Sequence, residues 1–125
     1  MDIHLFFKSV LDQDRASIVL CDLAHTVVYL NPAAEKLHGK ALLGKNLLDC
    51  HNARSQELIR RSVEWFGKSR SNNILYESYN EKENKDNYIV ALRDGDGVLI
   101  GYYEKHEYRD RETGKPVSVQ YSSIG

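Results

Sequence analysis

Cys50 and His51 are neighbours in this chain whose side chains could do chemistry together. An imidazole beside a thiol can lower the pKa of the thiol and make it a redox sensor or a nucleophile. The same histidine could also bind a metal ion or a heme iron. Adjacent side chains usually point in different directions, however, and no third group that would orient the pair is recognisable. A reactive thiol, a heme or metal ligand and ordinary loop packing all stay open.

Nothing else in the sequence indicates catalysis. The other histidines have no spacing typical of a shared metal site; they are His4, His25, His38 and His106. No glycine-rich phosphate loop, Ser/His/Asp order or pair of catalytic carboxylates is found. Asp94 and Asp96 are better explained as turn formers than as acid or base groups. We therefore expect neither an enzymatic activity nor a bound metal.

Composition and charge exclude several other classes. The 125 residues are enough for one domain, and 42% of them are hydrophobic, so a core can form without disulfides. A net charge of −1, with basic and acidic residues interleaved, argues against direct binding of nucleic acid. The sequence shows neither a signal-peptide pattern nor an apolar run long enough to cross a membrane. Cys21 and Cys50 match no zinc or redox spacing, so we expect a reduced, cytoplasmic protein without membrane contact.

An amphipathic helix is predicted within residues 1–15. Its apolar residues recur at helical spacing; they are Ile3, Phe6, Phe7, Val10 and Leu11. This is too much apolar surface to leave in water. The helix could cover the open face of the chain's own sheet or pack against a second copy. We expect a homodimer whose interface contains Ile3, Phe6, Phe7 and Val10.

The rest of the chain alternates between strand and helix patterns. Strands are predicted at residues 17–22, 26–30, 73–80, 87–93 and 98–108, and the Asp-Gly-Asp-Gly run at 94–97 favours a hairpin. Asn31 and Pro32 begin a helix, and residues 55–66 form a longer one. Residues 45–54 are expected to be an irregular link, and residues 81–86 a charged connector. This order predicts an α+β fold, with a five-stranded antiparallel sheet and helices on one face.

Three stretches of the sequence carry a family resemblance. The first is residues 18–39, in which Asp22 and the run from Asn31 to Glu35 are the most specific part. The others are the Gly-Lys-Asn run at 44–46 and the closing hairpin at 94–101. In these residues the chain resembles the PAS family over residues 3–108. Residues 44–55 are most similar to PAS domains found beside hemerythrin-like modules in bacterial sensors.

The resemblance implies a signal-receiving domain at residues 16–109, often dimeric, with a small-molecule pocket between helices and sheet. A polar tail follows at 110–125, in which residues 117–121 could add an edge strand. By family habit, the output would be regulation of transcription or two-component signalling. Light-sensing members carry Asn-Cys-Arg-Phe-Leu-Gln where residues 49–54 here read Asp-Cys-His-Asn-Ala-Arg, and heme-binding members place a histidine on the long helix. Neither flavin nor heme is therefore expected, and the cofactor, if there is one, stays unknown.

The function predicted on this basis is that of a sensory or regulatory module. It would bind a small ligand or a signalling protein partner and signal by rearranging the N-terminal helix or the dimer. The expected ligand-binding residues are Leu20, Val28, Leu37, Leu47, Cys50, His51, Leu58, Tyr76, Tyr88 and Val90. Two alternatives are a structural dimerisation domain with a filled core and a heme- or thiol-based redox sensor that uses Cys50 and His51.

Overall fold

Residues 1–117 are described by a computed structural model. In chain order, the elements of this part are α1 (Ile3–Gln13), β1 (Ser17–Asp22), β2 (Val27–Leu30), α2 (Pro32–His38), the 3₁₀ helices η1 (Lys40–Leu42) and η2 (Leu47–Cys50), α3 (Ala53–Lys68), β3 (Ile74–Asn80), β4 (Lys85–Arg93) and β5 (Leu99–Tyr108).

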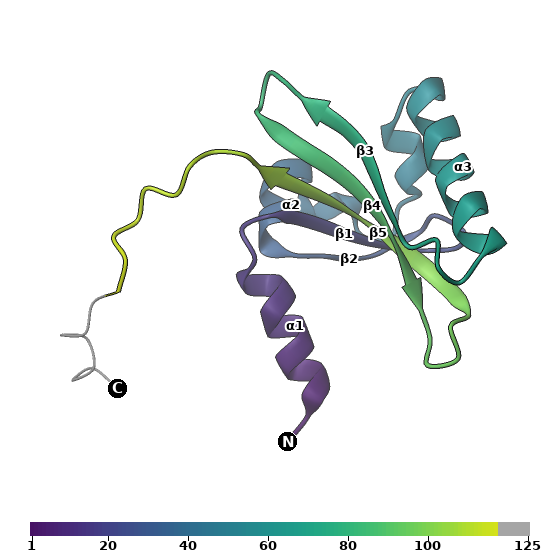
Figure 1. The fold of residues 1–125 in the computed structure, drawn as a ribbon, viewed down its shortest axis with the longest axis horizontal. Coiled ribbons are helices and arrows are strands. Elements are labelled where there is room, and N and C mark those ends of the chain that lie inside the picture. Colours follow the sequence, from purple (N-terminus) through teal and green to yellow (C-terminus); the bar gives the residue numbers. More distant parts are fainter. Residues whose placement is uncertain (118–125) are drawn as a thin grey trace.

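The strands form one antiparallel sheet in the order β2-β1-β5-β4-β3. The last strand of the chain therefore lies between β1 and β4, where it joins the N-terminal hairpin to the C-terminal strands. Helices α2 and α3 lie over one face of the sheet, and α1 extends away from it (Figure 1). The predicted α+β fold, with helices on one face and an N-terminal helix, is confirmed.

The core lies between this sheet and the helices. Ile59 and Phe66 of α3, seven residues and about two turns apart, are fully buried in one cluster with Ile89 of β4 and Tyr102 of β5. Strand side chains alternate between the two faces of a sheet. Residues in step with Ile89 and Tyr102 therefore point toward the helices, on what we call the inner face, and the intervening residues lie on the outer face.

The junction between β2 and α2 is built around the fully buried side chain of Asn31. Its Oδ1 accepts hydrogen bonds from the amides of Ile18 and Ala34, which caps α2 and ties it to β1. Its Nδ2 donates to the carbonyl of Leu11 at the end of α1. The predicted cap, with Pro32 at the start of the helix, is confirmed. One amide side chain thus connects α1, β1 and α2.

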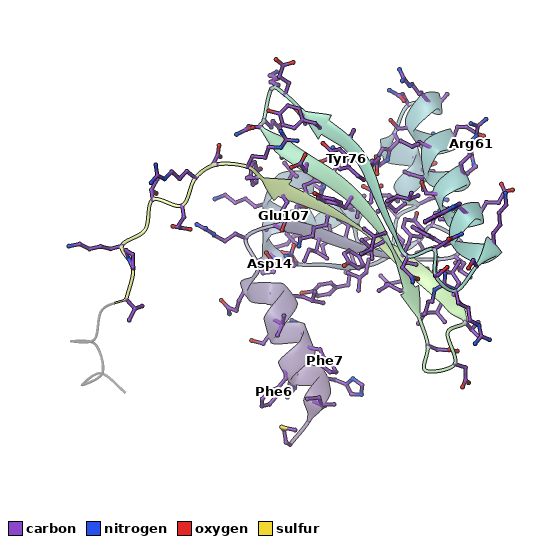
Figure 2. All side chains as sticks on the ribbon, viewed as in Figure 1. Phe6, Phe7, Asp14, Arg61, Tyr76 and Glu107 are labelled. Atoms are coloured by element: carbon purple, nitrogen blue, oxygen red, sulfur yellow. The ribbon has the colours of Figure 1, made fainter. Side chains whose placement is uncertain are left out.

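Helix α1 has no buried residue, although it carries the predicted apolar stripe. Phe6 and Phe7 are 56% and 58% exposed, and both project from the part of the helix that stands clear of the sheet (Figure 2). Only the last turn is attached, through Leu11 and through the hydroxyl of Tyr29, which donates to Asp12. Within residues 1–117, no helix combines the length and apolar character needed to cross a bilayer.

Two segments differ from the sequence expectation. Strand β4 begins at Lys85, inside the stretch expected to be a charged connector, and Lys85 is buried. Its ammonium lies 2.5 Å from the carboxylate of Glu83, and this ion pair allows a lysine to occupy the sheet. The expected irregular link contains η2, because Leu47 and Leu48 fold into the core. Of the possible strand at 117–121, residues 118–121 lie outside the described residues.

Candidate functional site

A row of polar side chains crosses the inner face of the sheet. His106 of β5 lies opposite Ser17 of β1 on one side and Asn87 of β4 on the other. Asn87 in turn lies opposite Ser78 of β3, and its Nδ2 donates a 3.1 Å hydrogen bond to the Ser78 hydroxyl. His106 and Asn87 are in step with the buried residues of their own strands, so the row faces the helices.

Two glutamates stand beside this row. Glu104 precedes His106 by two residues and therefore shares its face; it is only 6% exposed. Burial, and secondarily the charge of Glu77, raise the pKa of Glu104 to about 8, so this carboxyl is mostly protonated at neutral pH. Glu77 lies where the register between β3 and β4 shifts, and burial raises its pKa as well.

Two histidines from the connecting segments approach the same region. His38 is the last residue of α2, and its ring centroid lies 5.9 Å from that of His106. His51 follows η2, and its Nδ1 lies 2.9 Å from the carbonyl oxygen of Leu47. Burial lowers the pKa of His38 and lowers that of His106 to about 4; the positive charge of Lys85 acts in the same direction. Both of these imidazoles are therefore neutral at pH 7.

We call this group of side chains the interior polar cluster; its members are Ser17, His38, His51, Glu77, Asn87, Glu104 and His106. Four of its buried atoms have no hydrogen-bond partner among the described residues: Ser17 Oγ, Asn87 Oδ1, Glu104 Oε1 and His106 Nδ1. In folded proteins such atoms are almost always paired with protein, water or a ligand. The cluster is therefore the candidate functional site. In the same part of the chain, no three His, Cys, Asp or Glu residues are arranged to hold a metal ion.

This sheet with its helical cover is similar to several solved structures. A PAS domain from Colwellia psychrerythraea shares 16% identity at a TM-score of 0.65, over 86% of this chain and 97% of that one. The PAS domain of BvgS from Bordetella pertussis shares 17% identity at a TM-score of 0.57, over 89% of each chain. A sensory box sensor histidine kinase from Vibrio cholerae shares 16% at a TM-score of 0.56, over 84% of this chain and 90% of that one. The chain has a PAS fold. No protein-family model and no curated protein sequence matches it.

The PAS fold separates the ligand-binding residues expected from the sequence into two groups. Those on the outer face of the sheet, or exposed at the irregular part of the β1–β2 pairing, are Leu20, Val28, Tyr76, Tyr88 and Val90. The sequence makes them candidates for the lining of a pocket between helices and sheet, with the face of each left open, and the register of the strands turns them away from the helices. The reason is alternation: Leu20, Val90 and Ile74 are aligned with Tyr103, one residue out of step with the inner-face Tyr102.

The other expected residues lie on the helical side of the domain. Leu47 is buried in the core, whereas Leu37 of α2 and Leu58 of α3 are exposed at 39% and 42%. Leu58 lines a groove of about 670 Å³ between α3 and β3, and Glu77 lies at its inner end. His51 belongs to the interior polar cluster. Of the ligand-binding residues expected from the sequence, His51 is the one that lies in the same cluster as the buried atoms without hydrogen-bond partners.

Of the roles left open for Cys50 and His51, a hydrogen-bonded thiol–imidazole pair is not formed. The Cys50 thiol is free and exposed, whereas the His51 imidazole hydrogen-bonds to the backbone of η2 through Nδ1. The other cysteine, Cys21, is buried in the core, and burial raises the pKa of its thiol to about 12. This geometry gives neither thiol the nearby hydrogen-bonded base that activates a catalytic or redox cysteine.

Sequence reasoning missed most of the interior polar cluster. Glu77 and Glu104 belong to no recognisable motif, and the spacing of His38 and His106, which are far apart in the chain, does not indicate a shared site. One local signal was available. In the strand at 98–108, Glu104 and His106 alternate in step with Tyr102, which is unusual for a face that must be buried.

Proposed function

We propose that this PAS domain is a non-catalytic sensory module of the cytoplasm that signals through α1 as a homodimer. The observation that carries the proposal is the exposure of the apolar stripe of α1, with Phe6, Phe7 and Val10 between 56% and 68% exposed. An isolated helix of 11 residues is marginal in water, so a partner surface is needed to fix its position. The interior polar cluster would receive the signal, in the form of a small ligand.

The occupant proposed for the stripe is a second copy of the same chain. The outer face of the sheet carries an apolar surface that is partly or largely exposed and that α1 of the same copy leaves uncovered; its residues are Leu20, Ile74, Tyr76, Tyr88, Val90 and Tyr103. Figure 2 shows Tyr76 on β3, well separated from Phe6 and Phe7. In a twofold dimer, each α1 could cover the outer face of the other copy, because such interfaces are self-complementary.

A short physical route connects the proposed receiving and signalling parts. His38 of the interior polar cluster ends α2, and Asn31 begins it. The Asn31 side chain in turn donates to the carbonyl of Leu11, in the last turn of α1. A change of packing around His38 would therefore tilt a seven-residue helix whose other end holds α1. Such a shift between two packings is a sufficient mechanism for signalling.

The experiment is a measurement of mass in solution by sedimentation for the wild type and three variants. We expect a dimer that Phe7→Ser or Val10→Ser weakens at least tenfold. Leu5→Ser is the matched control, because Leu5 is 64% exposed but points about 160° away from Phe7 around the helix. A monomeric wild type at 100 μM, or equal weakening by all three variants, refutes the proposed interface.

A structural dimerisation domain with a filled core is the second candidate. The complete burial of Ile59, Phe66, Ile89 and Tyr102 favours it, since these side chains occupy much of the space between helices and sheet. Native mass spectrometry of the purified protein separates the two functions. A co-purifying small molecule supports the sensor, whereas dimers that carry only the mass of two chains support the scaffold.

A further inference from the structure

The unpaired atoms of the interior polar cluster are mainly hydrogen-bond acceptors. Asn87 uses its Nδ2 to bond Ser78, so its free atom is the carbonyl oxygen. His106 is neutral, and its Nδ1 accepts a hydrogen bond when the ring proton is on Nε2. Glu104 Oε1 accepts when the carboxyl is ionised, and Ser17 Oγ can do either. A ligand that pairs these atoms must therefore supply several hydrogen-bond donors.

The charges around the site also favour a donor that is positive. Glu104 is faced by Glu77 from β3, and its charge also acts on Cys21 of β1 and Tyr102 of its own strand. His38 and His51 approach from the helical side next to His106. The positive charge of Lys85 acts on His106 and opposes a second cation there, but the Lys85 ammonium is paired with Glu83 at 2.5 Å and lies 6.0 Å from the centre of the Tyr108 ring. The two inner carboxyls are thus left without a cation of their own among the described residues.

We propose that the interior polar cluster binds the ammonium group of a small organic amine. The three N–H groups of a primary ammonium match the three acceptors contributed by Asn87, Glu104 and His106. The amine binds in its protonated form, and Glu104 releases its proton to the solvent, so that a carboxylate faces the cation. This inference rests on the proposed sensory function, for which it names the class of ligand.

The groove between α3 and β3 gives a route to this site. It has a volume of about 670 Å³, and its lining includes Glu77, a member of the interior polar cluster, and Ser78, which is hydrogen-bonded to Asn87 of the cluster. Two arginines line this groove: Arg61 is paired with Glu57 at 3.1 Å, whereas Arg54 has no ion pair among the described residues, so Glu57 and Glu77 offset only part of the positive charge there. The aliphatic part of an amine would then lie against Leu58, which is partly exposed in the same groove.

The test is an NMR titration of ¹⁵N-labelled protein with propylamine, using 1-propanol and propionate as neutral and anionic controls of similar size. Propylamine, like the lysine side chain, stays protonated up to about pH 10. We expect saturable shifts of the Asn87 side-chain signals with propylamine alone. Its affinity should rise about tenfold per pH unit between pH 6 and 8, because only the ionised Glu104 binds the cation.

Two variants decide the role of Glu104. Glu104→Gln should weaken propylamine at least tenfold and remove the pH dependence, whereas Glu81→Gln, on the exposed β3–β4 turn, should change neither. Equal binding of 1-propanol, unchanged binding to the Glu104→Gln variant, or no binding at 100 mM propylamine overturns the inference. Each of these results leaves the α1 dimer standing, because sedimentation tests that part without any ligand.

Discussion

Replacing Glu104 by glutamine should make the protein more stable at neutral pH and leave it unchanged in acid. Burial raises the pKa of this carboxyl from 4.5 to about 8 in the folded protein. Between these two values the folded state keeps a proton that the unfolded state releases. The folded state therefore loses relative stability as the pH rises through this window. Glutamine has nearly the same shape as the protonated acid and does not titrate.

The size of the effect follows from the same two pKa values. Each pH unit above 4.5 lowers the free energy of unfolding of the wild type by about 1.4 kcal/mol. The loss reaches roughly 3 kcal/mol at pH 7 and levels off near pH 8. Glu104 is 6% exposed, so solvent screening reduces this figure little. Burial raises the pKa of the neighbouring Glu77 carboxyl as well, so the transition in the difference between the two proteins should be broadened.

The assay is urea unfolding followed by the fluorescence of Trp65, the single tryptophan, at pH 4.5 to 8.5. The free energy of unfolding of Glu104→Gln minus that of the wild type should grow with pH by about 1.4 kcal/mol per unit. Titration of the histidines affects both proteins and cancels in this difference. Glu81→Gln is the control with the same substitution at an exposed position. A difference that does not change with pH, or that falls as pH rises, refutes the reasoning.

Two further predictions concern residues that stabilise the fold around the interior polar cluster. Asn31→Ala should cost about 3 kcal/mol, because it removes a cap and leaves buried backbone groups unpaired, whereas the exposed cap variant Asn52→Ala should cost about 1 kcal/mol. Equal losses in urea unfolding would contradict this account. Gly101→Ala should destabilise by 2 kcal/mol or more, since the new methyl group would meet a backbone carbonyl of β1, in contrast to Gly95→Ala, which faces open space. A melting temperature of Gly101→Ala within about 2 °C of the wild type would disprove the clash.

Glu104→Gln is expected to have opposite effects on stability and on ligand binding, and this contrast indicates that the buried acid serves binding. The variant should gain stability at neutral pH and lose the proposed ligand. A residue that costs folding energy and yet organises a binding site is the usual form of a trade-off between stability and activity. A carboxyl that had only a packing role could be replaced by glutamine with no loss of binding.

The parts of the fold that depend on neighbours in sequence were predictable. Three features depend only on residues that are close together in the sequence: the start of α2 at Asn31–Pro32, the turn at 94–97 and the amphipathic pattern of α1. All three are present in the structure. The α+β class followed from the order of such local patterns. The buried position of Lys85 in β4 was not predictable from local sequence, because a lysine is buried in a strand only when a partner such as Glu83 pairs with it.

The elements, their order and the family resemblance could be predicted from short-range patterns in the chain. Which face of each strand meets the helices depends on the register across the sheet, which turns Tyr76, Tyr88 and Val90 away from the helices. The tertiary structure also aligns Ser17, Asn87 and His106, three residues from distant parts of the chain, by inserting β5 between β1 and β4. A shift of one residue in any of these registers would move the side chains to the other face. That register is set by contacts across the whole core, which no local stretch of sequence contains.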